Sequence, residues 1–299
     1  MRALLLVSSA LLIAAAPPAK PKTPSEIVAS APASAWRDVN PDDLLVMDLR
    51  NGGRVVIQLA PQFAPVHVAN IRALAKGGWW SGASIYRVQD NYVVQWGNNE
   101  SERPLPKGVV AKPPAEYHRA LKGLAVRPLD YPDDYAPKAG FASGWPIGFD
   151  PKAGTGNLAH CYGYVGVGRD LSPDTGTGGE LYAVIGHAPR HLDRNIAVVG
   201  RVIEGIERMS SLPRGTEALG FYKDASQNVP ISSVRLASEI PAAERPEFQV
   251  MDTMSAAFGA YLKARANRND DFFIRPAGGV DLCNVNVPVR RKPALTFGG

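Results

Sequence analysis

The sequence predicts a mainly β protein built around an antiparallel barrel or sandwich. Many short runs of β-branched and aromatic residues alternate with turn residues, whereas apolar residues at helical spacing occur in only a few short segments. The chain of 299 residues contains 29 Gly and 26 Pro, a content that favours turns and loops over a helical bundle. This length allows one sizeable core or two modest ones.

The first clear elements are a hairpin, a helix and a second hairpin. Residues 44–59 contain two strand-like runs joined by Asn-Gly-Gly, which predicts a tight hairpin. Pro65 suits the first turn of a helix whose apolar residues recur at helical spacing until Gly77 ends it. Residues 85–97 then contain two further runs of strand-forming residues around Gln-Asp-Asn, which predicts a second hairpin.

The middle of the chain divides into an irregular part and a strand-rich part. Residues 99–160 are rich in Pro, Gly, Asp and Tyr and show little periodicity, so we expect an expanded irregular loop. After it, strand-like runs begin at Cys161, Leu181, Ile196 and Pro230, with a short helix before the last of them. Several short strands with few helices are typical of an antiparallel barrel or sandwich.

The two ends of the chain differ from the middle. Residues 1–19 contain an Arg, an apolar run and small residues, the pattern of a secretory signal peptide. The run is short for a membrane span, but Pro17 is awkward after a cleavage site and leaves an uncleaved anchor open. We interpret residues 20–40 as a flexible linker, residues 41–240 as the main domain and residues 241–299 as a C-terminal extension.

The C-terminal extension contains the longest helical pattern of the chain. Its apolar residues share one helical face, which predicts a helical extension, and the run near residue 285 is read as one more strand. The residues of this face are Val250, Met254, Ala257, Phe258 and Leu262.

Charge and cysteine content limit the partners. The net charge of +5 is spread along the chain, so no nucleic-acid partner is expected. No metal or cofactor is expected either, because no residues stand at ligand spacing; we interpret the histidines, His160 among them, as loop residues, and Asp133-Asp134 as a solvated turn. Cys161 and Cys283 form a disulfide or remain two buried thiols, and the sequence leaves both open.

The second hairpin carries the chemical signal. Each of its strands holds one long hydrogen-bonding side chain, Arg87 and Gln95, among aromatic and β-branched neighbours. One cation, one amide and an apolar wall suit prolyl cis–trans isomerisation, which needs no nucleophile. A donor aimed at the imide nitrogen binds the twisted peptide bond better than the planar one. The alternative is an ordinary amphipathic hairpin whose Arg87 faces solvent.

Two regions of the chain carry motifs of a known family. Residues 60–98 contain Asn-Ile-x-x-Leu, then Ile-Tyr-Arg and Gln-Trp-Gly-Asn, and residues 163–205 end in Val-Val-Gly-Arg-Val-Ile-Glu-Gly. These regions resemble the cyclophilin family of peptidyl-prolyl isomerases, which has Phe-His-Arg and Gln-Gly-Gly-Asp at the second and third motifs. The resemblance covers residues 44–236. It implies a closed antiparallel β-barrel with flanking short helices and a groove that binds proline-containing peptides.

The resemblance also assigns roles to individual residues. Arg87 corresponds to the catalytic cation and Gln95 to its hydrogen-bonding neighbour. The other positions that correspond to the substrate-binding surface are Tyr92, Val93, Gly168, Arg169, Glu180, Tyr182, His191, Leu192 and Ile196.

Three of these positions depart from the family pattern. Glu180 replaces a pocket Gln, and we expect its carboxylate to pair with Arg87. Ile196 stands where many members have a pocket His, and His191 where many have Trp. The resemblance therefore implies a retained groove with altered selectivity or weakened activity.

The resulting hypothesis is an exported, periplasmic peptidyl-prolyl cis–trans isomerase that acts as a monomer on proline-containing or unfolded segments of exported proteins. It contacts a membrane only if residues 1–19 are not cleaved. Two alternatives stay open: a non-catalytic proline-peptide-binding module on the same fold, and an envelope assembly protein organised by the C-terminal helix.

Overall fold

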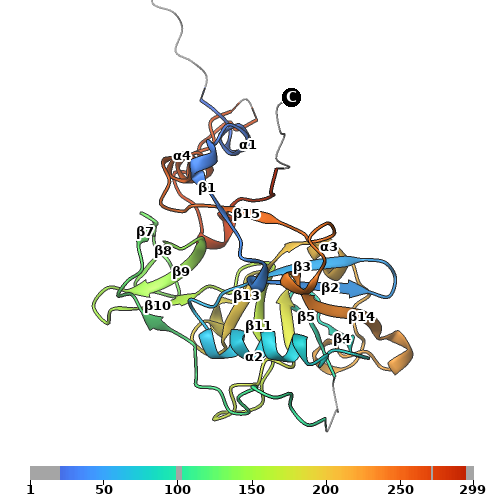
Figure 1. Cartoon of the computed structure of the whole chain (residues 1–299). Coiled ribbons are helices and arrows are strands. Elements are labelled where there is room, and N and C mark those ends of the chain that lie inside the picture. Colours follow the sequence, from blue (N-terminus) through green and yellow to red (C-terminus); the bar gives the residue numbers. More distant parts are fainter. Residues whose placement is uncertain (1–20, 99–102, 271, 294–299) are drawn as a thin grey trace, which may run out of the picture.

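A closed antiparallel barrel of eight strands forms the centre of the molecule. The computed structural model describes residues 21–98, 103–270 and 272–293, so the predicted signal peptide lies outside the described residues. The strand order around the barrel is β11-β12-β5-β4-β14-β2-β3-β13, and every pairing is antiparallel (Figure 1). The strands are β2 (Leu44–Leu49), β3 (Arg54–Leu59), β4 (Ser84–Val88), β5 (Val93–Gly97), β11 (Tyr164–Val167), β12 (Leu181–Val184), β13 (Val198–Glu204) and β14 (Val229–Leu236). The predicted mainly β fold and both predicted hairpins are confirmed.

The helix α2 (Pro65–Lys76) lies along the lower side of the barrel in Figure 1. Its apolar face, including Val68, Ile71 and Leu74, is fully buried in the same hydrophobic core as the barrel interior. The helix has no side-chain cap of its own. Instead, the Glu116 carboxylate accepts hydrogen bonds from its first free backbone N–H groups at 2.9 Å, which places a negative charge at the positive helix end.

The segment that we expected to be an irregular loop, residues 99–160, instead contains a five-stranded antiparallel sheet in the order β6-β10-β9-β8-β7. Glycines within these strands interrupt the strand-like pattern of the sequence. They are needed there because neighbouring backbones pack closely. A Cβ atom at Gly140 would lie 2.4 Å from the carbonyl oxygen of Arg127. The strands are β6 (Arg119–Ala120), β7 (Val126–Pro128), β8 (Lys138–Ala142), β9 (Trp145–Asp150) and β10 (Thr155–Leu158).

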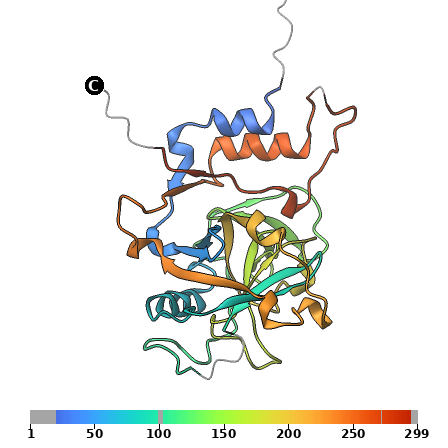
Figure 2. The same ribbon diagram turned by 90° about the vertical axis from the view of Figure 1, so that its right-hand side faces the viewer.

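Residues 21–40, expected to be a flexible linker, are also ordered. Thr23 and Glu26 form a capping box at the start of α1 (Pro24–Ala29), and β1 (Trp36–Asp38) pairs with a strand of the C-terminal extension. An isolated helix of this length is not stable, so its order comes from packing. Figure 2 shows α1 beside α4 (Ala256–Ala266), above the barrel.

The C-terminal extension is mixed rather than helical throughout. β15 (Phe248–Met251) lies between β1 and β16 (Val289–Arg291) in a three-stranded sheet, and Ser255 caps the helix α4 that follows. The predicted helical face was therefore wrong at its beginning, since Val250 belongs to the strand and Met254 to the turn. Strand pairing with residues far away in the chain decides this boundary.

These additions share a second hydrophobic core. Phe141 and Trp145 of the five-stranded sheet, Trp36 of the N-terminal segment, and Phe248 and Phe258 of the extension belong to one buried cluster. Short helices complete the structure: α3 (Ile206–Ser210) and the 3-10 helices η1 (Ala33–Ala35), η2 (Pro41–Asp43), η3 (Arg190–Leu192), η4 (Ala218–Gly220), η5 (Ala225–Gln227), η6 (Ala237–Glu239) and η7 (Leu282–Asn284). Within the described ranges, none of the helices is long and apolar enough to cross a bilayer.

A disulfide joins Cys161, just before β11, to Cys283 in η7 of the extension. The structure thus selects the bridged state from the two that the sequence leaves open. The bond closes a loop between residues 122 positions apart in the chain and ties the extension to the barrel.

We expect reduction of this disulfide to lower the free energy of unfolding by about 2–5 kcal/mol, because the unfolded chain gains the freedom of a long open loop. Denaturant titrations with and without dithiothreitol measure the change. The double variant Cys161→Ser/Cys283→Ser is the control and should be insensitive to the reductant. An unchanged unfolding midpoint of the wild type after complete reduction would contradict the prediction.

Candidate functional site

The hairpin of β4 and β5 brings Arg87 and Gln95 together. The two residues are cross-strand partners, and Arg87 Nη1 donates to Gln95 Oε1 at 2.9 Å. The strand register shifts between Ile85 and Arg87. As a result of this bulge, the consecutive residues Tyr86 and Arg87 both contact Gln95. Gln95 Nε2 donates to the Tyr86 hydroxyl at 2.7 Å. The predicted pair is therefore present, with Tyr86 as a member that sequence reasoning did not assign a role.

The Arg87 guanidinium is held in place from several sides. Its Nε donates to the carbonyl oxygen of Leu219 at 2.7 Å, and its Nη2 donates to Gln89 Oε1 at 2.6 Å. The ring of Phe221 lies 5.4 Å from the guanidinium carbon. Leu219 itself has a positive φ of 58°, a conformation unfavourable for a branched residue. The surrounding loop thus fixes the position of the cation.

The hydrogen-bond chain that starts at Arg87 ends at Glu180. The Tyr86 hydroxyl accepts from Gln95 and donates to Glu180 Oε2 at 2.6 Å. The carboxylate lies over Gly97, where a Cβ atom would come within 2.0 Å of it. The expected ion pair between Glu180 and Arg87 was wrong: no such pair forms among the described residues, because the carboxylate accepts from Tyr86 instead.

Burial changes the acid–base properties of this chain. Desolvation raises the pKa of the Glu180 carboxyl to about 7, although the hydrogen bonds from Tyr86 and from the backbone of Asn98 favour the ionised form. Desolvation also raises the pKa of the Tyr86 hydroxyl, and the nearby Glu180 charge acts in the same direction. Glu180 therefore titrates near neutral pH and carries a partial charge there.

The raised pKa of Glu180 predicts a pH-dependent contribution to stability. Its pKa in the unfolded chain is near 4.5, so the folded state retains a proton that the unfolded state loses as the pH rises from 4.5 to 7. The contribution of protonated Glu180 to the free energy of unfolding is complete below pH 4.5 and is lost by about pH 7. We expect the unfolding free energy of the wild type, minus that of Glu180→Gln, to fall by about 3 kcal/mol over this interval. Urea titrations at several pH values measure it, and a difference independent of pH would contradict the prediction.

An apolar pocket adjoins Arg87. Val93 and Tyr182 are buried, and Tyr92, Leu192 and Ile196 pack against them in a small cluster separate from the barrel core. The cluster is lined by strand β5, strand β12 and the segment around η3. A wall of this composition can hold a proline ring and exclude water from it.

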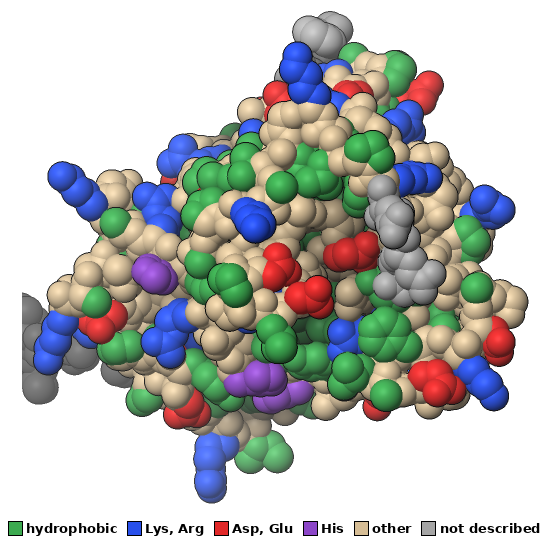
Figure 3. Space-filling model, turned by 90° about the horizontal axis from the view of Figure 1, so that it is seen from below, with side chains coloured by type: hydrophobic (Ala, Val, Ile, Leu, Met, Phe, Trp, Pro, Cys, Tyr) green, Lys and Arg blue, Asp and Glu red, His purple; other side chains and the backbone are tan. Residues whose placement is uncertain are grey.

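The cation and the apolar pocket belong to one groove of about 1060 Å³. Figure 3 views the molecule from below and shows a hollow near the centre of that face, with acidic side chains gathered beside it. His191 does not line the groove but stacks on the Tyr92 ring at 6.2 Å. The predicted site residues that line it are Arg87, Tyr92, Val93, Gln95, Gly168, Arg169, Glu180, Tyr182, Leu192 and Ile196.

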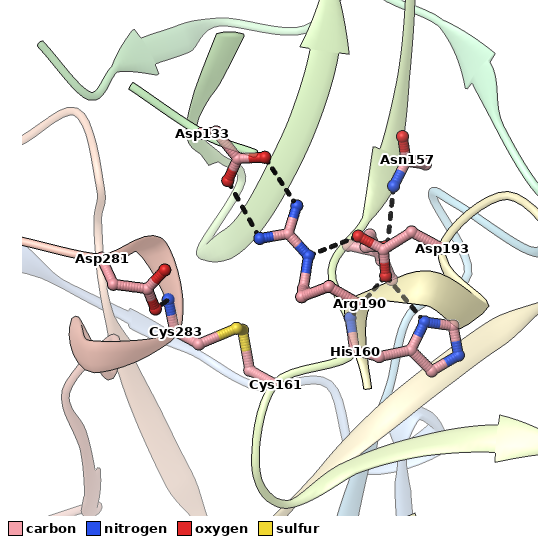
Figure 4. The surroundings of a disulfide bond; sticks show 9 residues. Asp133, Asn157, His160, Cys161, Arg190, Asp193, Asp281 and Cys283 are labelled. Atoms are coloured by element: carbon pink, nitrogen blue, oxygen red, sulfur yellow. Dashed lines mark hydrogen bonds and ion pairs between the residues drawn. A yellow bond between two sulfur atoms is a disulfide. The ribbon is translucent and has the colours of Figure 1, made fainter. Parts of the chain in front are cut away.

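A buried polar chain near the Cys161–Cys283 disulfide (Figure 4) extends to Tyr182 at the pocket floor. The Tyr182 hydroxyl lies 3.0 Å from His160 Nε2, and His160 Nδ1 lies 2.8 Å from the Asp193 carboxylate. Asp193 also accepts from Arg190, which donates to both carboxylate oxygens of Asp133 at 2.9 and 3.1 Å. The chain therefore links the loop between β7 and β8, which contains Asp133, to the floor of the groove.

This chain corrects one sequence interpretation. His160 lies in a loop between β10 and β11, as expected, and its side chain is 1% exposed. The Asp133 side chain, expected to be solvated, is only 3% exposed. Neither role has a local signal, because the partners Tyr182, Asp193 and Arg190 are distant in the chain. The hydroxyl of Tyr182 is the one sequence feature that required such a partner, because a buried Tyr O–H needs a hydrogen-bond partner.

Within the residues described, no group of three or more His, Cys, Asp or Glu side chains is placed to hold a metal ion. The chemistry available here is that of a fixed cation, a hydrogen-bonding amide and an apolar pocket.

Comparison with known proteins agrees with this geometry. Residues 44–236 match the model of the family described as "Cyclophilin type peptidyl-prolyl cis-trans isomerase/CLD". A protein of Brucella suis biovar 1 (strain 1330), named probable peptidyl-prolyl cis-trans isomerase, is 24% identical over 179 residues, which are 60% of this chain and 76% of that protein. A protein of the same name from Brucella abortus (strain 2308) has the same identity and coverage.

The fold is also similar to a solved structure, cyclophilin AquaCyp293 from Hirschia baltica. The TM-score is 0.69 at 24% sequence identity, over 90% of this chain and 97% of that one. This coverage extends beyond residues 44–236, so the shared architecture includes much of the second core. The match of the family model over most of the chain shows that this protein belongs to the cyclophilin-type peptidyl-prolyl cis-trans isomerase family.

Proposed function

We propose that this groove isomerises prolyl bonds in unfolded segments of exported proteins, with Arg87 as the catalytic cation. The observation that carries the proposal is the position of Arg87. Its guanidinium is fixed by Gln89, Gln95 and Leu219 beside an apolar pocket, and no carboxylate neutralises it among the described residues. Burial lowers the pKa of Arg87, yet an arginine stays charged at any physiological pH.

The chemistry follows from the barrier of the reaction. Rotation about a peptide bond costs about 18–20 kcal/mol because amide resonance is lost. As the bond twists, the proline nitrogen becomes pyramidal and basic, and a charged N–H donor then binds it more strongly than in the planar state. Tyr92, Val93 and Tyr182 surround the proline ring, so water does not compete with Arg87 for the nitrogen. Gln95 orients the guanidinium.

Two features support an exported location. Residues 1–19 have the pattern of a secretory signal, and the Cys161–Cys283 disulfide suits an oxidising compartment such as the periplasm. We propose that the protein acts there as a monomer. Cell fractionation with an antibody against the mature chain tests the location, and recovery only from the cytoplasm would contradict it.

The activity is tested by NMR exchange measurements on a short proline peptide. We expect catalytic amounts of the protein to accelerate cis–trans exchange well above the spontaneous rate. Chemical-shift changes of the peptide without acceleration would instead establish the non-catalytic binding module. Glu180 and Ile196, which depart from the family pattern in the groove, are the residues that favour this second function.

A further inference from the structure

The Glu180 carboxylate faces the groove without a cationic partner. Its recorded hydrogen bonds come from the Tyr86 hydroxyl and from the backbone of Asn98, and both donors are neutral. The ion pairs among the described residues do not include Glu180. A carboxylate that has lost part of its water and has no counter-charge is a favourable partner for an incoming cation.

The two arginines that line the groove do not supply that counter-charge. Arg87 donates to Gln89, Gln95 and Leu219, and so its hydrogen bonds are directed to neutral oxygens. Arg169 donates to the backbone carbonyl oxygens of Asp170 and Asn195. The Glu180 side of the groove therefore keeps a carboxylate that neither arginine neutralises.

Glu180 is also close to the pocket that would hold proline. It directly precedes β12, and Tyr182 lies two residues further along the same strand direction. Alternate residues of a strand point to the same side and are spaced about 7 Å apart. The side chain between them, Leu181, is fully buried in the barrel core, whereas both Glu180 and Tyr182 line the groove. A two-residue step along an extended peptide spans the same distance.

We propose that Glu180 is a specificity-determining residue that selects substrates with Lys or Arg one or two residues from the isomerising proline. With the proline ring against Tyr182, the basic side chain extends toward Glu180, and its aliphatic part passes the Trp79 ring, which also lines this part of the groove. The ion pair would form in a partly desolvated groove, where it discriminates more strongly than at an exposed surface. This inference rests on the proposed function.

The experiment uses short peptides with one proline, in which Lys, norleucine or Glu occupies each of the two positions on either side of it. Exchange rates measured by NMR give kcat/KM for every peptide with the full-length protein. At one of the four positions we expect Lys to exceed norleucine about tenfold and Glu to fall below norleucine. Norleucine matches the apolar stem of Lys without its charge, so the ratio reports the charge alone.

Two variants identify the carboxylate responsible. In Glu180→Gln the Lys-to-norleucine ratio should fall close to one, whereas Asp174→Asn should keep the preference. Asp174 also lines the groove, but its carboxylate accepts from the backbone N–H groups of Asp170 and Gly176. Each Lys-to-norleucine ratio is measured within one variant, so it does not depend on the basal activity of that variant. If a variant does not fold, the wild-type peptide series still shows whether a basic residue near the proline is preferred.

The outcomes separate this inference from the proposed function. Equal rates for Lys and norleucine at all positions, with clear isomerisation of the neutral peptides, would overturn the inference alone. A preference that persists in Glu180→Gln but disappears in Asp174→Asn would overturn the assignment to Glu180. Failure to isomerise any peptide would overturn the proposed function and the inference with it.

Discussion

Arg87→Ala should lower kcat/KM for a proline peptide by about 100-fold or more, the effect typical of removing a preorganised donor to a transition state. The variant keeps the apolar pocket of Tyr92, Val93 and Tyr182 but loses the charged N–H groups beside it. We therefore expect kcat to fall far more than KM changes. Exchange measurements at several peptide concentrations separate the two parameters.

Arg87→Lys is the matched control for charge. A lysine restores the positive charge but cannot donate to Leu219, Gln89 and Gln95 at once, so its ammonium group is not fixed in the same position. We expect it to recover only part of the lost rate. An Arg87→Ala protein that isomerises the peptide as fast as the wild type would reject the mechanism and leave a barrel that merely binds proline peptides.

Arg190→Met should produce the largest loss of stability of any single substitution discussed above, about 3–5 kcal/mol. The Arg190 side chain is 4% exposed and neutralises Asp133 and Asp193, whose side chains are each 3% exposed. The substitution keeps the length and the apolar packing but leaves two buried carboxylates without a counter-charge. Denaturant unfolding monitored by fluorescence measures the effect.

Arg208→Met is its control at the surface. Arg208 and Glu207 form an ion pair at 3.7 Å with side chains 60% and 71% exposed, and such pairs contribute about 0–1 kcal/mol. If Arg190→Met destabilised the protein no more than Arg208→Met, the buried polar chain from Asp133 to Tyr182 would not contribute to the stability of the fold.

The sequence predicts the barrel well where periodicity and turn chemistry are local. The Asn-Gly-Gly turn, the alternation in residues 44–59 and the helix that begins at Pro65 each carry their signal within a few residues. The groove was also predictable, because Arg87, Gln95 and the pocket residues stand on a hairpin and strands whose order the family resemblance supplies. Their proximity is a property of the fold rather than of any single segment.

The second core was not predictable in the same way. The ordering of α1 depends on α4, and β1 depends on β15, partners more than half of the chain away. The burial of Asp133 likewise depends on Arg190, and the partner of Glu180 is Tyr86 rather than the nearby cation. Polar residues in Gly- and Pro-rich sequence look solvated until their distant partners are known.

The order of strands in the barrel has a consequence for synthesis. Leu45 of β2 pairs with Leu236 of β14, and Leu59 of β3 pairs with Gly200 of β13, so the first hairpin made has unpaired edges until most of the chain exists. Such non-local pairing makes folding slow, and open strand edges are sites of aggregation. Chains interrupted before Val229 should therefore depend on holding chaperones, although they already contain Arg87 and Gln95.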